Sequence, residues 1–308
     1  MLSVKRKSLA NKAGLILAVI IIAASVTVSL SGNWNRIYNA FGLGGVTTFV
    51  ASEGVSVHFI DVGQGDSALI ITQESYVLID SGEWAYYATV LNYLQSQDVH
   101  RLDYIIATHP HSDHIGSMSY IVSELDVRRI IKPQITDELI PVTGAYLRLL
   151  DAIEANNVEI IWAVPGDIFG LCDNSTLEIL GPLRDYDRLN DYSVVSRFTY
   201  FGSSFLFTGD IERTAESDLA DYAYIRADVL HVAHHGSATS GTAKFLNAVA
   251  GSHAVISVGS PNSYNHPRQE VLDRLTNRDY LIYRTDRHGH IVFDVTSEGF
   301  EVFTEKGG

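Results

Sequence analysis

The sequence has 308 residues with 46% apolar and 19% charged residues, which excludes a disordered chain and suffices for one large domain. Its formal net charge is −14, and four cations between Lys5 and Lys12 leave −18 for the remainder. An overall electrostatic attraction for nucleic acid is therefore excluded. The single cysteine, Cys172, excludes an intramolecular disulfide and a thiolate metal cluster.

Residues 1–30 predict a membrane segment. A basic stretch from Lys5 to Lys12 precedes the uncharged run 13–30, which is close to the about 20 apolar residues that span a bilayer. The positive flank favours a cytoplasmic N-terminus, so we expect a single-pass anchor in the cytoplasmic membrane and an extracytoplasmic body. The alternative is a cleaved signal peptide and a secreted protein. The run is longer than a usual signal-peptide core, and no clear A-x-A site follows it.

Residues 31–52 are predicted to form a stem. Four apolar side chains recur there at helical spacing, namely Trp34, Ile37, Tyr38 and Phe41. Such a stripe fits the membrane interface, where Trp and Tyr settle, and it fits packing against the following domain equally well.

From residue 53 to residue 308, alternating strand and helix patterns predict one α/β domain. We expect strands at residues 55–62, 67–72, 76–80, 102–108, 128–132, 159–164, 176–180, 193–200, 203–208, 227–232, 254–258, 280–285 and 290–295. We expect helices at residues 87–96, 145–156, 212–221, 242–250 and 268–276. Two successive strand-and-helix halves predict a sandwich with helices outside two packed sheets.

The strongest chemical signal is the segment from His109 to His114, HPHSDH, which directly follows a buried strand. Imidazole and carboxylate are suitable ligands for zinc and related divalent ions. His109 and His111 can point at one metal from an extended turn, while Asp113 and His114 can reach a second one. Three His and one Asp in six residues are hard to explain as core or surface-loop residues.

Two further segments fit the same site. Asp210 follows an apolar strand after Gly209, and its carboxylate could bridge two cations, although Gly-Asp alone is only a turn signal. His234 and His235 follow another apolar strand. Such a pair could cap the next helix, but beside the first motif at least one is expected to be a metal ligand.

The segment THPHSDHIG (residues 108–116) resembles the metal motif of the metallo-β-lactamase superfamily. The flanking segments resemble more narrowly the C-terminal hydrolase domain of the DNA-uptake competence protein ComEC. These segments are FIDVGQGDS (59–67), LIDSG (78–82), LFTGD (206–210), DVLHVAHHGS (228–237) and NSYNHP (262–267). The resemblance implies an αββα four-layer sandwich with metals at one edge.

The resemblance also implies a site for two divalent metal ions. His109 and His111 would bind the first ion, Asp113 and His114 the second, and Asp210 would bridge both. Zn²⁺ is the expected metal, and Mn²⁺ is the alternative.

The resemblance assigns roles to three further residues. His235 is favoured as the last ligand of the second ion, which leaves His234 as a substrate contact or acid, although the two could be exchanged. Asp80 would orient the metal loop through hydrogen bonds.

One departure from the superfamily concerns the first ion. Many members have another His between the metal motif and the bridging Asp, but none occurs here between Ile115 and Leu230. The ComEC-like pattern has an Asn and a Ser instead, which Asn190 and Ser193 match. Water, substrate or Asn190 would then complete the first site.

Three further residues are candidates for the site or for ordinary turns. Asp61 and Asp66 flank a Gly-rich turn, where they could cap the turn, and Asp66 could instead line the pocket. His266 could donate a proton or bind phosphate, or it could belong to an ordinary turn before a helix. The remaining histidines in or beside strands are expected to be structural or exposed.

These features predict an extracytoplasmic hydrolase in which water activated by two metal ions attacks a phosphodiester, with DNA as a possible substrate. A polynucleotide backbone would meet the one notable basic cluster, namely Arg268, Arg274, Arg278, Arg284 and Arg287. The alternatives are hydrolysis of a cell-envelope ester, a phosphorylcholine ester or a β-lactam, and a metal-stabilised binding module without turnover. No protein partner is indicated.

Overall fold

The computed structural model describes residues 49–222 and 224–307. The predicted anchor and nearly all of the predicted stem, including its aromatic stripe, lie outside these residues. Within the described residues, no helix has the length and apolar character needed to cross a membrane. The chain from Val50 onward forms one structural unit, and the description below concerns that unit.

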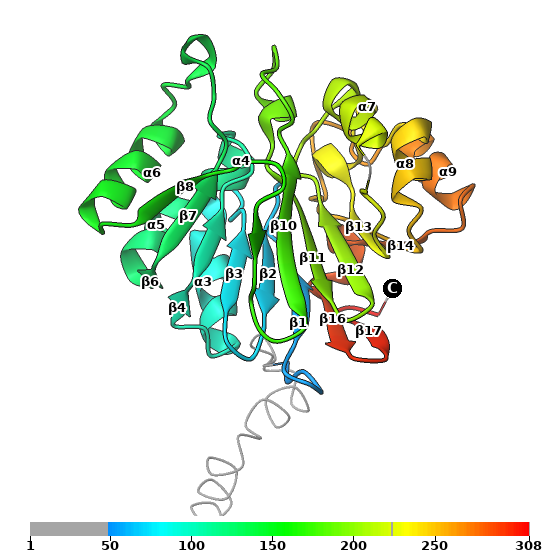
Figure 1. The fold of residues 1–308 in the computed structure, drawn as a ribbon, viewed down its shortest axis with the longest axis horizontal. Coiled ribbons are helices and arrows are strands. Elements are labelled where there is room, and N and C mark those ends of the chain that lie inside the picture. Colours follow the sequence, from blue (N-terminus) through cyan, green and yellow to red (C-terminus); the bar gives the residue numbers. More distant parts are fainter. Residues whose placement is uncertain (1–48, 223, 308) are drawn as a thin grey trace, which may run out of the picture. The chain divides into compact units, whose positions relative to one another are not determined.

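Eight strands form the first sheet, in the order β17-β16-β1-β2-β3-β5-β7-β8 (Figure 1). Their bounds are β1 Ser56–Phe59, β2 Ala68–Ile71, β3 Tyr76–Ile79, β5 Tyr104–Ile106, β7 Arg129–Lys132, β8 Glu159–Trp162, β16 Ile291–Thr296 and β17 Gly299–Thr304. Strands β3, β5, β7 and β8 are parallel neighbours. The C-terminal β16 returns to pair antiparallel with β1, so that Phe59 lies opposite Ile291. The sequence patterns predict β16 but not β17.

Seven strands form the second sheet, in the order β15-β14-β13-β12-β11-β10-β9. Their bounds are β9 Ile168–Phe169, β10 Ser175–Gly181, β11 Val195–Tyr200, β12 Ser203–Phe207, β13 Val229–His231, β14 His253–Ile256 and β15 Leu281–Arg284. Strands β11 and β12 form the predicted hairpin, whereas β12 to β15 run parallel. A separate pair consists of β4 Arg101–Leu102 and β6 Asp126–Val127.

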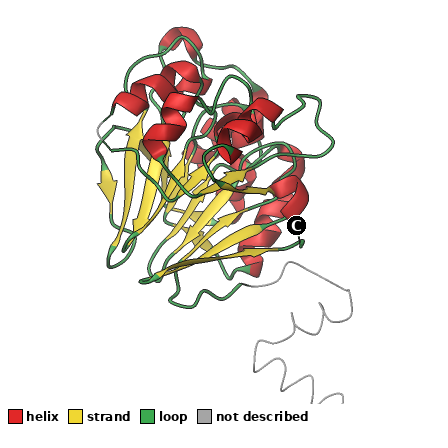
Figure 2. Cartoon of the chain, turned by 90° about the vertical axis from the view of Figure 1, so that its right-hand side faces the viewer, coloured by secondary structure: helices red, strands yellow, loops and turns green. Residues whose placement is uncertain are grey.

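Helices border both sheets. The α-helices are α3 Tyr87–Ser96, α4 Ser112–Ile115, α5 Met118–Glu124, α6 Gly144–Ala155, α7 Arg213–Asp221, α8 Ala243–Val249, α9 Gln269–Thr276 and α10 Thr285–His288. The 3₁₀ turns are η1 Trp84–Tyr86, η2 Asp137–Leu139, η3 Asn190–Tyr192 and η4 Ala233–Gly236. Helices run along the outer sides of the two sheets (Figure 2).

Strand alternation explains this layering. Phe205 and Phe207 of β12 pack in a core between the sheets, where Phe207 stacks on Phe59 of β1 with ring centroids 5.9 Å apart. Leu206 points to the other face and packs in a second core with Phe245 of α8. Because both faces of such strands are buried, their sequences are continuous apolar runs. The predicted α/β fold with two packed sheets is confirmed.

The outer face of β1 carries a buried histidine that makes stability depend on pH. His58 Nδ1 lies 2.8 Å from the Tyr93 hydroxyl of α3, and Nε2 lies 2.7 Å from Ser56 Oγ. Burial, helped by nearby His290, lowers the pKa of His58 from 6.5 to about 3. Between pH 6.5 and about pH 3, His58 binds a proton in the unfolded chain but not in the folded chain, so acidification favours unfolding.

We expect His58→Gln to flatten this acid dependence, because glutamine keeps polar atoms near both partners and does not titrate. Between pH 7 and pH 5, the free energy of unfolding of the original chain should fall by about 2 kcal/mol more than that of the variant. Chemical denaturation in the presence of a chelator measures both slopes without a contribution from metal release. Parallel pH curves would show that His58 is protonated in the folded state.

Candidate metal centre

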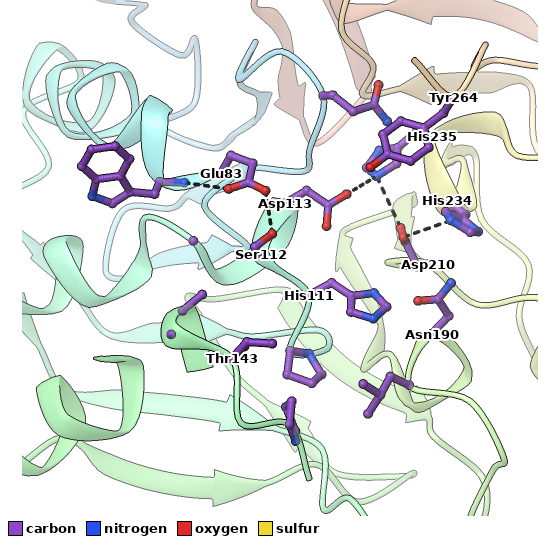
Figure 3. Close-up of a pocket in the computed structure, with 18 of the residues that line it drawn as sticks. Glu83, His111, Ser112, Asp113, Thr143, Asn190, Asp210, His234, His235 and Tyr264 are labelled. Atoms are coloured by element: carbon purple, nitrogen blue, oxygen red, sulfur yellow. Dashed lines mark hydrogen bonds and ion pairs between the residues drawn. The ribbon is translucent and has the colours of Figure 1, made fainter. Parts of the chain in front are cut away.

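The predicted metal ligands meet where the carboxyl ends of strands from both sheets converge. His109 to His114 follow β5 of the first sheet, Asp210 follows β12 of the second sheet, and His234 and His235 follow β13 beside it. Figure 3 shows His111, Asp113, Asp210 and His235 directed towards a common centre. Parallel strands gather the segments at their carboxyl ends on one edge, which explains why distant motifs form one site.

Three groups of side chains offer ligand atoms that lie within 4.8 Å of one another; one of them consists of Asp66, Asp80 and His114, and the other two contain the predicted ligands. Of these two, the first group consists of His109, His111 and Asp210, and the second consists of Asp113, His114, Asp210 and His235. Asp210 belongs to both groups, as expected for a carboxylate that bridges two ions. This buried His/Asp cluster is typical of a binuclear metal site, and the first group has one ligand fewer than the second.

The histidines of the second group present their Nε2 atoms to the centre. His114 Nε2 lies 3.2 Å from Asp210 Oδ1, and His235 Nε2 lies 3.3 Å from Asp113 Oδ2. On the far side of each ring, His114 Nδ1 lies 2.7 Å from Asp80 Oδ2 and His235 Nδ1 lies 2.9 Å from a backbone oxygen. Acceptors at Nδ1 select the tautomer whose Nε2 lone pair is available to a metal.

Unsatisfied polar atoms and charge both fit divalent cations. In the part of the chain that the structure describes, the buried atoms His114 Nε2 and Asp210 Oδ1 lie 3.2 Å apart without forming a hydrogen bond, and neither has another hydrogen-bond partner. Four carboxylates surround the centre, namely Asp66, Asp80, Asp113 and Asp210, and no described Lys or Arg forms an ion pair with any of them. Two divalent cations would balance these four charges, which burial otherwise makes costly.

The pKa shifts show that the site favours positive charge. Burial opposes ionisation of Asp210, yet His114 and His235 hold the pKa of this carboxyl well below its usual range. Burial likewise opposes protonation of His114, yet Asp210, Asp80 and Asp113 raise the pKa of His114 well above its ordinary value. The carboxylates therefore stabilise a cation at this centre, and a bound metal would take the place of the protons.

Asp80 and Ser193 both hydrogen-bond to the ligand loops, a role that the resemblance implies for Asp80. Asp80 accepts hydrogen bonds from the backbone nitrogen of Thr108 (2.9 Å) and its hydroxyl (2.6 Å), in addition to its bond with His114. Ser193 Oγ accepts from the backbone nitrogen of Asp210 at 3.0 Å and lies 3.3 Å from His109 Nδ1. Ser193 thereby links the bridging carboxylate to a histidine of the first group.

The two aspartates of the Gly-rich turn occupy different places. Asp66 is 3% exposed and does not line the cavity; its Oδ1 lies 3.1 Å from His235 Nδ1, behind the ligand. Asp61 accepts a hydrogen bond from the backbone nitrogen of Gly63 and pairs with Lys306, so it caps the turn. The expectation that Asp66 lines the pocket is therefore not met, because its side chain lies behind His235.

The paired histidines differ sharply in environment. His235 is a member of the second ligand group, and its side chain is 2% exposed. His234 is outside both groups, its side chain is 22% exposed, and its Nε2 lies 3.6 Å from Asp210 Oδ2. Both residues adopt left-handed backbone conformations, with φ of 54° and 53°, and their ring centroids lie 6.2 Å apart at an interplanar angle of 68°.

The centre opens into a cavity of about 690 Å³. Predicted residues in its wall include Asn190, His234 and His266, and burial together with His235 and His234 lowers the pKa of His266 to about 4. The wall also contains residues that the sequence analysis does not single out, namely Gln64, Glu83, Trp84, Thr143 and Arg148. None of the five arginines of the predicted basic cluster lines this cavity.

Comparison with known proteins identifies the family. The family model described as "Metallo-beta-lactamase superfamily" matches residues 60–260. The chain belongs to this superfamily. It is also related, at 30% identity over 269 residues, to "ComE operon protein 3" of Bacillus subtilis (strain 168), covering 79% of this chain and 33% of that protein. "Competence protein ComA" of Neisseria gonorrhoeae is 30% identical over 246 residues, which cover 78% of this chain and 32% of that protein.

The chain thus spans about a third of the length of the curated relatives that it matches. Among solved structures, CmlA, a diiron beta-hydroxylase from Streptomyces venezuelae, superposes with a TM-score of 0.51 at 13% identity. The superposition covers 78% of this chain and 54% of CmlA, and it shows a shared fold. Taken together, the fold and the buried His/Asp cluster are those of a metal-dependent hydrolase.

Proposed function

We propose that this protein is an extracytoplasmic, metal-dependent phosphodiesterase that cleaves polynucleotides. The observation that carries the proposal is the position of Asp210 in both ligand groups, at the floor of an open cavity. A pair of cations held in this way suits an in-line displacement at phosphorus, since it can clamp both the attacking and the leaving oxygen. The similarity to "Competence protein ComA" and, at 28% identity over 252 residues, to "Recombination protein 2" of Haemophilus influenzae supports a nucleic-acid substrate.

The bound cations would activate water and neutralise the charge that develops on the phosphate oxygens. The ligand set of histidine and aspartate suits Zn²⁺, and Mn²⁺ is the alternative, particularly at the three-ligand first group. Asn190 lies in the cavity wall, and its buried Oδ1 has no hydrogen-bond partner among the described residues. This oxygen is the protein atom best placed to supplement the first group.

His234 is the side chain that we assign to the leaving group. Its Nδ1 lies 3.2 Å from Thr239 Oγ1 and 3.6 Å from Glu212 Oε1, so these neighbours fix the ring while Nε2 faces the cavity. Nε2 can donate a hydrogen bond to the departing oxygen. His266, whose ring centroid lies 5.6 Å from that of His234, completes this wall and contacts the phosphate.

The location of the protein is part of the proposal. The uncharged run at residues 13–30, preceded by basic residues, supports a single-pass anchor in the cytoplasmic membrane with the hydrolase unit outside. Cleavage after this run would instead give a secreted enzyme.

The alternative substrate class, a cell-envelope ester, is favoured by the formal net charge of −14.

The test uses the full chain, purified in detergent without chelator and assayed with Zn²⁺ or Mn²⁺. Single- and double-stranded DNA and bis(p-nitrophenyl) phosphate are the substrates. We expect metal-dependent cleavage of DNA, with kcat/KM lowered at least about a hundredfold in His111→Ala because a ligand of the first group is lost. His100→Ala, which removes an exposed histidine outside the cavity, is the matched control.

The possible outcomes separate the candidate functions. Cleavage of the small diester alone would move the substrate to a smaller envelope phosphodiester. Absence of turnover on every substrate, with metal bound at full stoichiometry, would contradict the hydrolase proposal and favour a binding module.

A further inference from the structure

Two exposed aromatic side chains line the metal cavity. Trp84 is 51% exposed and Tyr264 is 59% exposed, and both belong to the same cavity wall as the ligands His111 and Asp113. Figure 3 shows Glu83, which precedes Trp84, on the opposite side of Asp113 from Tyr264. A chain-like substrate that crosses the metal centre would therefore meet an aromatic ring on each side of its reacting group.

The backbone below Trp84 is held firmly. The Glu83 carboxylate accepts from the Trp84 backbone nitrogen at 3.2 Å and from Ser112 Oγ at 2.6 Å, and Ser117 Oγ donates to the Glu83 carbonyl at 2.6 Å. A Cβ at Gly116 would lie 2.5 Å from the Trp84 nitrogen, so only glycine allows this approach. The backbone of Trp84 is thus tied to the metal loop, while about half of the residue (51%) is exposed to solvent.

Tyr264 is fixed in a comparable way. Asn262 Nδ2 donates to the carbonyls of Gly259 (2.7 Å) and His266 (2.8 Å), and Asn262 Oδ1 accepts from the His266 nitrogen at 3.0 Å. The Tyr264 ring stacks on His266 at 5.7 Å and 27°, and His266 stacks on the ligand His235 at 6.3 Å and 28°. A ladder of nearly parallel rings therefore leads from the cavity mouth to the second ligand group.

Cationic side chains cannot provide much of the affinity for a polyanion. Among the described residues that line the cavity, Arg148 is the only Lys or Arg. Aromatic stacking does not need cations and accepts every base, because each base has a π-face. Within the described residues, the Trp84 indole nitrogen and the Tyr264 hydroxyl make no hydrogen bond, so both rings are available to a ligand.

We infer that Trp84 and Tyr264 are the specificity-determining residues of this site, and that they stack unpaired bases on either side of the scissile phosphate. The inference rests on the proposed phosphodiesterase function and deepens it. Recognition by stacking selects a single-stranded polynucleotide, since bases in a duplex are already stacked and paired. It also makes binding depend weakly on salt.

The test compares KM and kcat of the full metal-loaded chain on a single-stranded oligonucleotide. We expect Trp84→Ala and Tyr264→Ala each to raise KM about tenfold, with kcat within about threefold of the original value. Trp84→Phe and Tyr264→Phe should restore most of the loss. Phe201→Ala is the matched control, since it removes a 45% exposed aromatic at the hairpin tip, at the other end of β12 from Asp210.

Two further readouts do not depend on the folding of any variant. The first uses an oligonucleotide with abasic sites on both sides of the scissile position. Its KM with the unsubstituted protein should be as high as the KM of the alanine variants on the intact oligonucleotide. Raising salt from 50 to 200 mM should increase KM by less than about threefold, as expected for one phosphate contact to a single strand.

The outcomes separate the inference from the function on which it rests. If the original chain cleaves the oligonucleotide but the alanine variants match Phe201→Ala, stacking is overturned and the phosphodiesterase stands. A steep salt dependence of KM, or full activity on the abasic substrate, would likewise overturn stacking and leave the phosphodiesterase proposal intact. If the metal-loaded chain cleaves no polynucleotide, the proposed function fails and the inference fails with it.

Discussion

Replacement of Asp210 by asparagine is expected to abolish hydrolysis, with kcat lowered at least about a thousandfold. Asp210 is the one side chain shared by both ligand groups, and it is 2% exposed. Asparagine preserves the shape but removes the negative charge that opposes the repulsion between two cations. The three-ligand first group would keep only His109 and His111 as full-strength ligands.

The number of metal ions bound per chain provides a second test of the role of Asp210. The original chain should bind two equivalents of metal, whereas Asp210→Asn should bind one or fewer, with the first group losing its ion before the second. Asp221→Asn is the matched control, because this carboxylate is exposed on α7 and pairs only with Lys244 among the described residues. Retention of two tightly bound ions and of activity in Asp210→Asn would show that Asp210 does not bridge.

The ligand groups could be predicted from the sequence because every ligand follows an apolar strand directly. His109 comes three residues after the end of the buried strand at Ile106, and Asp210 comes three residues after the end of the strand at Phe207. When strands are parallel neighbours or lie in packed sheets, their carboxyl ends must gather at one edge. Local pattern and global topology therefore agree for these residues.

The supporting residues were less predictable because their roles depend on burial and on tertiary contacts. Asp61 and Asp66 flank one turn, yet one caps that turn while the other lies behind His235, more than 160 residues away in sequence. Burial separates them, and no spacing rule reports burial at a turn. Trp84 and Arg148 reach the cavity from η1 and α6, elements whose sequences carry no ligand motif.

The closing strands show a similar limit. The strand pattern near residue 290 predicts β16, but its pairing with β1 joins segments about 230 residues apart, and many registers would satisfy the pattern. β17 has an intermediate or exposed surface throughout and alternates weakly, so its strand character depends on pairing with β16. Membership of a sheet edge is a tertiary property that local propensity does not encode.

Replacement of Gly65 by alanine is expected to damage the metal centre although the side chain binds nothing. Gly65 has φ of +150°, and a Cβ there would lie 2.4 Å from the backbone oxygen of Asp113. That oxygen also accepts a hydrogen bond from the Asp66 backbone nitrogen at 3.1 Å, so the Gly-rich turn and the metal loop are in direct contact. We expect relief of the clash to displace Asp113, a ligand of the second group.

We expect Gly65→Ala to lower the free energy of unfolding by at least about 2 kcal/mol, through backbone strain and lost packing. Displacement of a ligand by about 1 Å should lower kcat roughly a hundredfold and weaken binding of the second metal. Gly170→Ala is the matched control, since that position has no positive φ and no atom within 4 Å of the added carbon. Denaturation curves and metal titration of both variants measure these effects. Equal metal affinity in the two variants would mean that the Gly-rich turn yields to the methyl group, and that the conformation of the metal loop is set by Asp80 and the LIDSG segment instead.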